Sequence, residues 1–169
     1  MTVHATRLGL FGVAVLALTV VACEPPSREG TAAPVPAGSA AEAPPQPFDS
    51  GPVRPAHEYL EQPEFASADL ERGELLGLAC LACHKLAAGE GTLVGPNLHS
   101  VFGRPAGSLS GFEFSPALRA SGLVWTPVSL EAWLADPSGF VVGTTMAFTG
   151  YRSPEDRRDL IAYLLRATQ

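Results

Sequence analysis

Apolar and polar residues divide the chain into three stretches with different patterns. Residues 8–23 form an apolar run without a charged side chain, whereas residues 24–65 are rich in proline and alanine and show no helical or strand period. From residue 66 to the end, apolar residues recur at helical spacing, most clearly at positions 160, 161, 163, 164 and 165. We therefore expect a leader over residues 1–22, a linker over residues 23–65 and one folded domain over residues 66–169.

Capping residues predict where the helices of this domain begin. Ser67 or Asp69 is suited to cap a helix that runs into Cys83. Three later segments begin with a hydroxyl residue followed by a proline, which suits the first helical position, at residues 115–116, 126–127 and 153–154. Gly122 can end the first of these three helices, and Pro137 limits the second.

The regions between these helices are long. No segment shows the clean alternation of a strand, so we expect an all-α fold with loops over residues 85–114 and 136–152. Loops of this length are unusual in a compact domain of roughly 100 residues. They need something to wrap around.

The composition excludes one class of function. The chain has 169 residues, a formal net charge of −6 and a pI near 5.1. This charge argues against nucleic-acid binding, which needs clustered lysine and arginine. The three cysteines, Cys23, Cys80 and Cys83, are an odd number and do not suggest a disulfide framework.

The first residues have the layout of a secretory signal. The basic Arg7 precedes an apolar run of about 15 residues, which is shorter than the roughly 20 that span a bilayer. The run ends at Val20-Val21-Ala22-Cys23, which resembles a bacterial lipobox, where the chain is cut before the cysteine and the cysteine is acylated. An ordinary signal peptide and an uncleaved membrane anchor are the alternatives. All three place residues 24 onward outside the cytoplasm, and the lipobox predicts lipid attachment at Cys23.

The linker over residues 23–65 is expected to be flexible. A segment with few aliphatic residues cannot bury enough surface to offset the entropy of ordering it. Proline-rich chains extend by up to about 3.1 Å per residue, so this segment could reach on the order of 100 Å. We interpret it as a tether between membrane and domain, the alternative being a tail without a purpose.

The segment Cys80-Leu81-Ala82-Cys83-His84 is compatible with three chemistries. A thioredoxin-like redox pair would need a βαβ pattern, and none is present. A zinc site would combine Cys80, Cys83, His84 and His99, but adjacent Cys83 and His84 are awkward ligands of one tetrahedral ion. The third chemistry is covalent attachment of a c-type haem, for which C-x-x-C-H is the signature.

Helical spacing explains this signature. Residues three or four apart share one face of a helix, so Cys80 and Cys83 can each bond one haem vinyl group while His84 points at the iron. Met146, the only methionine besides Met1, is the candidate for the second axial ligand. His99 is the alternative ligand.

From about residue 66 to the end the chain resembles a class I cytochrome c of the mitochondrial and bacterial c2 type. The matching segments occur in family order and are CLACHKL at 80–86, GPNLHSVFGRPAG at 95–107, LVWT at 123–126, VVGTTMAFTGY at 141–151 and DRRDLIAYLLRAT at 156–168. The match covers the globular part and none of the tether. The resemblance implies the class I cytochrome c fold, with haem-wrapping helices and loops and with the first and last helices of the domain crossing.

The resemblance also implies a role for individual residues. One covalent haem c would be held by Cys80 and Cys83, with His84 and Met146 as axial ligands. The remaining positions would form the haem environment: the Pro96 carbonyl accepting a hydrogen bond from His84, Arg104 and Trp125 holding a propionate, and Phe148 covering the haem edge. Where the helices cross, Gly73 or Gly77 would meet Leu160, Tyr163 and Leu164.

The charge of the expected domain departs from this family. The lysines that ring the haem edge in mitochondrial members correspond here to Ser138, Gly139 and Thr145, and residues 66–169 hold eight Lys and Arg against ten Asp and Glu. Steering toward an acidic partner should therefore be weak. Tethering would compensate by raising the effective concentration of membrane partners.

We therefore expect a monomeric one-electron carrier rather than an enzyme. It would act on the periplasmic side of a bacterial membrane, between a quinol-oxidising complex of the bc1 type and a terminal oxidase or photosynthetic reaction centre. The alternatives are a fixed haem subunit of a larger oxidoreductase and a ligand-binding or peroxidase-like haem protein with a weak Met146 bond.

Overall fold

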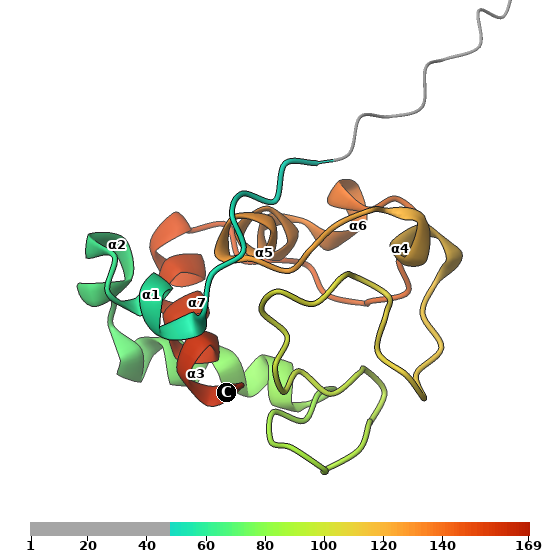
Figure 1. Ribbon diagram of the computed structural model, residues 1–169, viewed down its shortest axis with the longest axis horizontal. Coiled ribbons are helices and arrows are strands. Elements are labelled where there is room, and N and C mark those ends of the chain that lie inside the picture. The colour runs from blue at the N-terminus through green and yellow to red at the C-terminus, as the bar shows by residue number, and fades with distance from the viewer. Residues whose placement is uncertain (1–47) are drawn as a thin grey trace, which may run out of the picture. The chain divides into compact units, whose positions relative to one another are not determined.

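The computed structural model describes residues 48–169, which form helices joined by loops and contain no β-strand. Within these residues the helices are α1 (Ala56–Leu60), α2 (Pro63–Ala66), α3 (Leu70–Leu81), α4 (Pro116–Ala120), α5 (Pro127–Ala135), α6 (Pro137–Phe140) and α7 (Pro154–Ala167). Figure 1 shows α1, α2, α3 and α7 at one end of the domain and α4 and α6 at the other. The expectation of an all-α domain is confirmed for this part of the chain.

The capping side chains are those that the sequence indicates. The side chain of Asp69 accepts a hydrogen bond from the backbone N–H of Arg72 at the start of α3, at 3.0 Å. Ser115, Thr126 and Ser153 cap α4, α5 and α7, and a proline follows each of them. These four helices begin where they do because an oxygen satisfies an N–H group that the first turn leaves unpaired.

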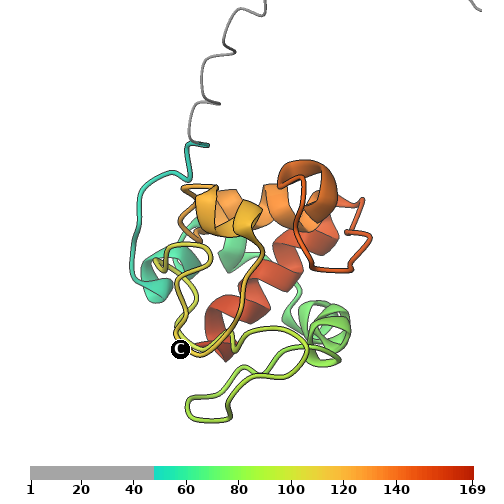
Figure 2. The ribbon, with the colours of Figure 1, turned by 90° about the vertical axis from the view of Figure 1, so that its right-hand side faces the viewer.

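Helix α3 packs closely against α7, and two glycines make the approach possible. A Cβ atom at Gly73 would overlap the backbone carbonyl of Asp159, and one at Gly77 would lie 2.6 Å from the ring of Tyr163. Figure 2 shows α3 nearly end-on while α7 runs obliquely past it. Of the expected partners Leu160, Tyr163 and Leu164, Tyr163 is the one that both glycines meet, and the Asp159 carbonyl is an unexpected partner.

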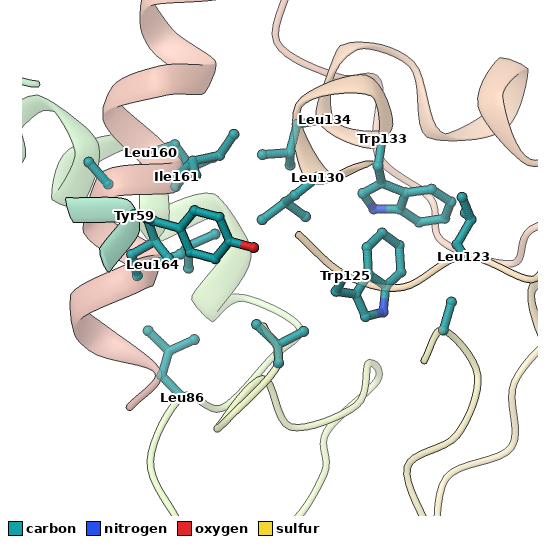
Figure 3. Close-up of a cluster of buried hydrophobic side chains, with 14 of the residues drawn as sticks. Tyr59, Leu86, Leu123, Trp125, Leu130, Trp133, Leu134, Leu160, Ile161 and Leu164 are labelled. Carbon is teal, nitrogen blue, oxygen red and sulfur yellow. The ribbon is translucent and has the colours of Figure 1, made fainter. Parts of the chain in front are cut away.

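The hydrophobic core joins α7 to the helices around it. Leu160 and Leu165 of α7 are fully buried. Figure 3 shows Leu160 and Ile161 facing Leu130 of α5, with Trp125 and Trp133 beyond them. The two indole rings pack edge to face with centroids 5.4 Å apart. The core therefore extends from α7 to the segment that the resemblance assigns to the haem environment.

The first long loop lacks helix and strand, as expected, whereas the second contains one short helix. Leu98 N–H donates to the carbonyl of Lys85 and Gly95 N–H to the carbonyl of Cys83, both at 2.8 Å, which ties the loop over residues 85–114 to the end of α3. In the second loop, Asp136 caps α6, and Pro137, which was expected only to end the preceding helix, is the first residue of α6. Proline suits this position because the first helical turn needs no donor from it.

The expected boundary at residue 65 lies too far along the chain. Residues 48–66, here called the N-terminal strap, pack against the domain and include α1 and α2. Tyr59 and Phe65 are only 5% and 6% exposed, and the Tyr59 hydroxyl donates to the carbonyl of Pro52 at 2.6 Å. The strap is therefore part of the folded structure rather than of a flexible tether.

The expected leader over residues 1–22, the lipid-attachment residue Cys23 and the linker up to residue 47 lie outside the described residues. Between residues 48 and 169, no helix combines the length and the apolarity needed to cross a bilayer.

Candidate haem site

The end of α3 brings Cys80, Cys83 and His84 together on one turn. The carbonyl of Cys80 accepts hydrogen bonds from the backbone N–H of Cys83 at 3.0 Å and of His84 at 2.8 Å. The helical hydrogen-bond pattern thus continues to His84, although α3 ends at Leu81. This geometry keeps both thiols and the imidazole on neighbouring positions of the same turn.

The imidazole of His84 is held in one orientation. Its Nδ1 lies 2.7 Å from the carbonyl oxygen of Pro96, and because a carbonyl can only accept, Nδ1 carries the proton. Nε2 is therefore left with a free lone pair, as a metal ligand requires. Burial lowers the pKa of His84, and the Pro96 carbonyl partly opposes this by stabilising the protonated ring. The ring is thus neutral at physiological pH.

Gly95 leaves room for this ring. A Cβ atom at Gly95 would lie 2.7 Å from Nδ1 of His84, which is inside van der Waals contact. The loop backbone therefore lies directly against the imidazole, and its N–H donates to the Cys83 carbonyl on the same turn. His84 is fixed by packing on one side and by a hydrogen bond at Nδ1.

The two alternative chemistries find no support in this geometry. Burial raises the pKa of the Cys80 thiol to about 11, so the thiol stays protonated, whereas the attacking cysteine of a redox pair has a lowered pKa. In residues 48–169 no three His, Cys, Asp or Glu side chains are grouped so that they could hold a metal ion, as a zinc site would need.

Backbone hydrogen bonds hold the segment of Arg104 beside the segment of Trp125. Trp125 N–H donates to the carbonyl of Arg104 at 3.0 Å, and Gly103 N–H donates to the carbonyl of Trp125 at 2.7 Å. The guanidinium of Arg104 donates to the carbonyls of Asn97 and His99, at 3.0 and 3.1 Å. Since arginine has five N–H donors, these two bonds leave others for a further acceptor such as a carboxylate. Partial burial lowers the pKa of Arg104, but an arginine remains charged.

Met146 follows a tight turn over residues 141–144 and packs on the core. Its backbone N–H donates to the hydroxyl of Thr144 at 3.3 Å, and the N–H of Thr144 donates to the carbonyl of Val141 at 3.0 Å. Gly143 has φ of +91°, a conformation that favours glycine. No hydrogen bond in the described structure links this turn to His84, so the pairing of Met146 with His84 as axial ligands stays a prediction.

Phe148 and Tyr151 connect the Met146 segment to the rest of the site. Their rings pack edge to face with centroids 5.2 Å apart. The hydroxyl of Tyr151 donates to the carbonyl of Leu76 in α3 at 2.8 Å. Sequence reasoning missed this role of Tyr151, because the only signal was an aromatic residue at the end of the matching segment over residues 141–151.

His99 does not join the group around Cys83. Its backbone N–H donates to the side chain of Asn97 at 2.7 Å, and its Nδ1 is buried without a hydrogen-bond partner in the described part of the chain. The amide of Asn97 also donates to the carbonyl of Ala87 at 2.9 Å. The side chain of Asn97 thus links the backbone of Ala87 to that of His99 within the loop.

The donor set at the end of α3 fits a covalently bound haem. It provides two thiols on one turn, an imidazole whose Nε2 is free to coordinate, and a carbonyl that fixes the imidazole. A thioether from Met146 would complete the axial pair that is found in c-type electron carriers.

Known proteins resemble this chain over about three fifths of its length. A cytochrome c from Stellaria longipes is 41% identical over 106 residues, which are 62% of this chain and 98% of that protein. A cytochrome c2 from Rhodomicrobium vannielii is 40% identical over 105 residues, covering 62% of this chain and 82% of that protein.

The structural comparison agrees with these relatives. The structure of cytochrome cH from Methylobacterium extorquens aligns with a TM-score of 0.54 and 44% identity, covering 57% of this chain and 97% of that one. No protein-family profile matches the chain. The identity and the nearly complete coverage of these relatives are decisive: the chain belongs to the cytochrome c family, so it is an electron-transfer protein with one covalently bound c-type haem and not an enzyme.

Proposed function

We propose that this protein is a tethered one-electron carrier between membrane complexes, and that it acts as a monomer. Its donor would be a quinol-oxidising complex of the bc1 type, and its acceptor a terminal oxidase or a photosynthetic reaction centre. The observation that carries the carrier role is the His84–Pro96 hydrogen bond of 2.7 Å, which prepares Nε2 as a permanent axial ligand.

Each residue of the site has a proposed task. Cys80 and Cys83 form the covalent attachments, and His84 and Met146 are the axial ligands. Arg104 and Trp125 bind a propionate, and Phe148 covers the exposed edge. When bound, the haem supplies the Fe(II)/Fe(III) couple. Two strong axial ligands leave no open position for a substrate, which supports electron transfer rather than catalysis.

Rigidity of the protein ligands favours rapid electron transfer. The imidazole of His84 is fixed by the Pro96 carbonyl and by the close approach of Gly95. The Met146 segment is fixed through Tyr151, whose hydroxyl is bonded to Leu76. A site held in this way needs little rearrangement when the charge of the iron changes.

The membrane tether is the second part of the proposal. The lipobox-like Val20-Val21-Ala22-Cys23 supports acylation at Cys23 and a position on the periplasmic side of a bacterial membrane. Ser138, Gly139 and Thr145 are exposed and uncharged, at positions where the resemblance to mitochondrial cytochromes c would place lysine. Attachment near membrane complexes would replace the missing charge steering by a high effective concentration.

A fixed haem subunit of a larger oxidoreductase is the second candidate. The observation in its favour is the exposed side of α3, where Leu75, Leu78 and Leu81 are 69%, 58% and 40% exposed next to the haem-binding turn. An apolar surface of this kind suits a lasting protein contact better than a brief encounter. Co-purification of a partner in constant ratio, resistant to high salt, would favour this candidate over a mobile carrier.

The tether proposal is tested with the full-length holoprotein and its Cys23→Ser variant. Mass spectrometry of the N-terminal peptide should find acyl chains on Cys23 in the parent and none in the variant. We expect membrane-supported oxidation of the haem to slow at native protein concentration and to recover when excess soluble protein is added. Equal oxidation rates for both proteins at native concentration would contradict the proposed role of the tether. They would leave the proposed haem ligands uncontradicted.

A further inference from the structure

The N-terminal strap makes its most specific contacts with residues 124–126. The hydroxyl oxygen of Ser50 accepts a hydrogen bond from the backbone N–H of Val124 at 3.2 Å. The backbone carbonyl of Ser50 accepts a hydrogen bond from the hydroxyl of Thr126. Thr126 is 1% exposed and also caps α5. A single strap residue thus bonds to both chain neighbours of Trp125.

The other side of the same segment is bonded to the loop that carries Arg104. Trp125 N–H donates to the Arg104 carbonyl, Gly103 N–H donates to the Trp125 carbonyl, and Pro105 and Val124 form the isolated β-bridge. Residues 124–126 therefore lie between two backbones, the Arg104 loop on one side and Ser50 on the other.

Neighbouring strap residues strengthen this arrangement. The ring of Phe48 packs edge to face on Phe140 of α6, with centroids 4.8 Å apart. Val53 lies close to Gly103, where an added Cβ would be 3.1 Å from a Val53 methyl group. The resemblance identified from the sequence begins at about residue 66, so residues 48–53 come before it.

We propose that residues 48–53 of the strap are a positioning segment that fixes Trp125 and Arg104 at the haem and thereby sets the reduction potential. This inference rests on the proposed haem contacts of Trp125 and Arg104. Loosening residues 124–126 would admit water on this side of the site. Because water stabilises the more highly charged ferric state, the potential would fall.

Ser50→Ala tests the inference in the full-length holoprotein. The change removes the acceptor for Val124 N–H and leaves the backbone carbonyl of Ser50 in place for Thr126. We expect hydrogen exchange at the Val124 amide to become about three- to tenfold faster, as the loss of one hydrogen bond predicts. We also expect the reduction potential to shift downward.

Ser67→Ala is the matched control. Ser67 is exposed, and its hydroxyl donates to the carbonyls of Pro63 and Glu64 and makes no hydrogen bond to residues 124–126. This variant should keep the parental potential and the parental exchange rate at Val124. Faster exchange in Ser50→Ala without a potential shift beyond that of the control would overturn the inference, because the strap would then only stabilise the fold.

A double-mutant cycle separates this inference from the proposed haem site. Trp125→Phe removes the indole N–H, so it should shift the potential by itself if Trp125 contacts a propionate. In the Trp125→Phe background, Ser50→Ala should have a smaller effect than in the parent. Additive shifts would contradict action through Trp125. An unchanged potential in Trp125→Phe would refute the proposed contact, and with it the inference.

Discussion

The phenolic hydroxyl of Tyr151 donates a hydrogen bond of 2.8 Å to the backbone carbonyl of Leu76. Tyr151 ends the segment that carries Met146, and Leu76 lies in α3, one turn before Cys80. The two segments expected to supply the axial ligands are therefore bonded directly to each other. Burial raises the pKa of Tyr151, which keeps its hydroxyl a donor well above neutral pH.

Tyr151→Phe should loosen the Met146 segment while it leaves the haem attached. The lost hydrogen bond should lower the free energy of unfolding by about 1 kcal/mol. Because the Tyr151–Leu76 hydrogen bond holds the Met146 segment against α3, its loss should weaken the proposed bond from Met146 to the iron. We therefore expect the methionine–iron absorption band of the ferric protein to disappear at lower pH than in the parent. A pH titration followed at that band measures the effect.

The matched control for this prediction is Tyr163→Phe. The Tyr163 hydroxyl makes no hydrogen bond within residues 48–169, although its ring packs against Gly77. The control should keep the parental titration of the methionine–iron band. An equal shift in both variants would mean that the hydroxyl of Tyr151 has no special role.

Gly95→Ala should disturb His84 specifically. The new methyl group would lie 2.7 Å from Nδ1 of the imidazole, so either the ring or the loop has to move. Overpacking of this kind costs about 1–3 kcal/mol, and here it also weakens the bond to Pro96. We expect a lower yield of holoprotein and a spectrum with a displaced or lost histidine ligand.

Gly91→Ala, in the same loop, controls for backbone strain. Gly91 has φ of +73° and open space around the position of an added Cβ. It should lose some stability through strain but keep the parental spectrum. A normal haem spectrum in Gly95→Ala would show that the loop can retreat from His84 without cost to the ligand.

The two glycines of α3 should respond differently to alanine. At Gly73 the new methyl group meets the backbone of Asp159, which cannot move away, so we expect a loss of about 2–3 kcal/mol. At Gly77 it meets the ring of Tyr163, which is part of a side chain. In a Tyr163→Leu background, Gly77→Ala should become neutral or stabilising, because alanine favours a helix by about 1 kcal/mol over glycine. Denaturant unfolding of the parent, the three single variants and the Gly77→Ala/Tyr163→Leu double variant measures these free energies. A destabilisation by Gly77→Ala that persists in the Tyr163→Leu background would contradict the prediction.

Asp136 should make the stability of the domain depend on pH in the acidic range. Its carboxylate accepts hydrogen bonds from the backbone N–H of Gly139 and from the hydroxyl of Ser138, and these bonds hold its pKa below the usual 3.8. A carboxyl whose pKa is lower in the folded state contributes stability above its unfolded pKa, and this is lost as the pH falls through the folded pKa. Asp136→Ala should therefore be less stable than the parent near pH 6, with the difference shrinking as the pH drops below 3.8.

Asp136→Asn is the control for this titration. Asparagine also caps helices but does not ionise, so this variant should keep α6 and show a weaker acid dependence than the parent. Unfolding curves at several pH values measure both variants. A gap between Asp136→Ala and the parent that stays constant down to the lowest pH would rule out the ionised carboxylate as its source.

Local sequence signals predict the parts of the fold that depend on local chemistry. Asp69, Ser115, Thr126 and Ser153 each cap a helix, because capping needs only a side-chain oxygen and the next three residues. The turn with Cys80, Cys83 and His84 is predictable for the same reason, since the spacing of the motif is the geometry of a helical turn. Apart from the resemblance to the family, Met146 is singled out only because it is the one methionine after Met1.

Contacts between distant parts of the chain are not predictable in this way. The strap is rich in proline like the linker before it, and its only hint of order is the pair Tyr59 and Phe65, which are buried by α7 and its neighbours. The bond from Tyr151 to Leu76 joins residues 75 positions apart, and neither neighbourhood indicates the other. The contact of Tyr163 with Gly77 was expected only from the resemblance to the family, because the local sequence does not show how α3 lies on α7.

The attachment of Ser50 has a mechanical consequence. Tension applied to the chain ahead of residue 48 would enter the domain through the hydrogen bonds of Ser50 to Val124 and Thr126 and through the edge-to-face contact of Phe48 with Phe140. These contacts come before α1 and α2 along the chain, so pulling would load the start of α5 before it reaches α3. The turn with Cys80 and His84 is thus shielded from tension applied to the chain ahead of residue 48.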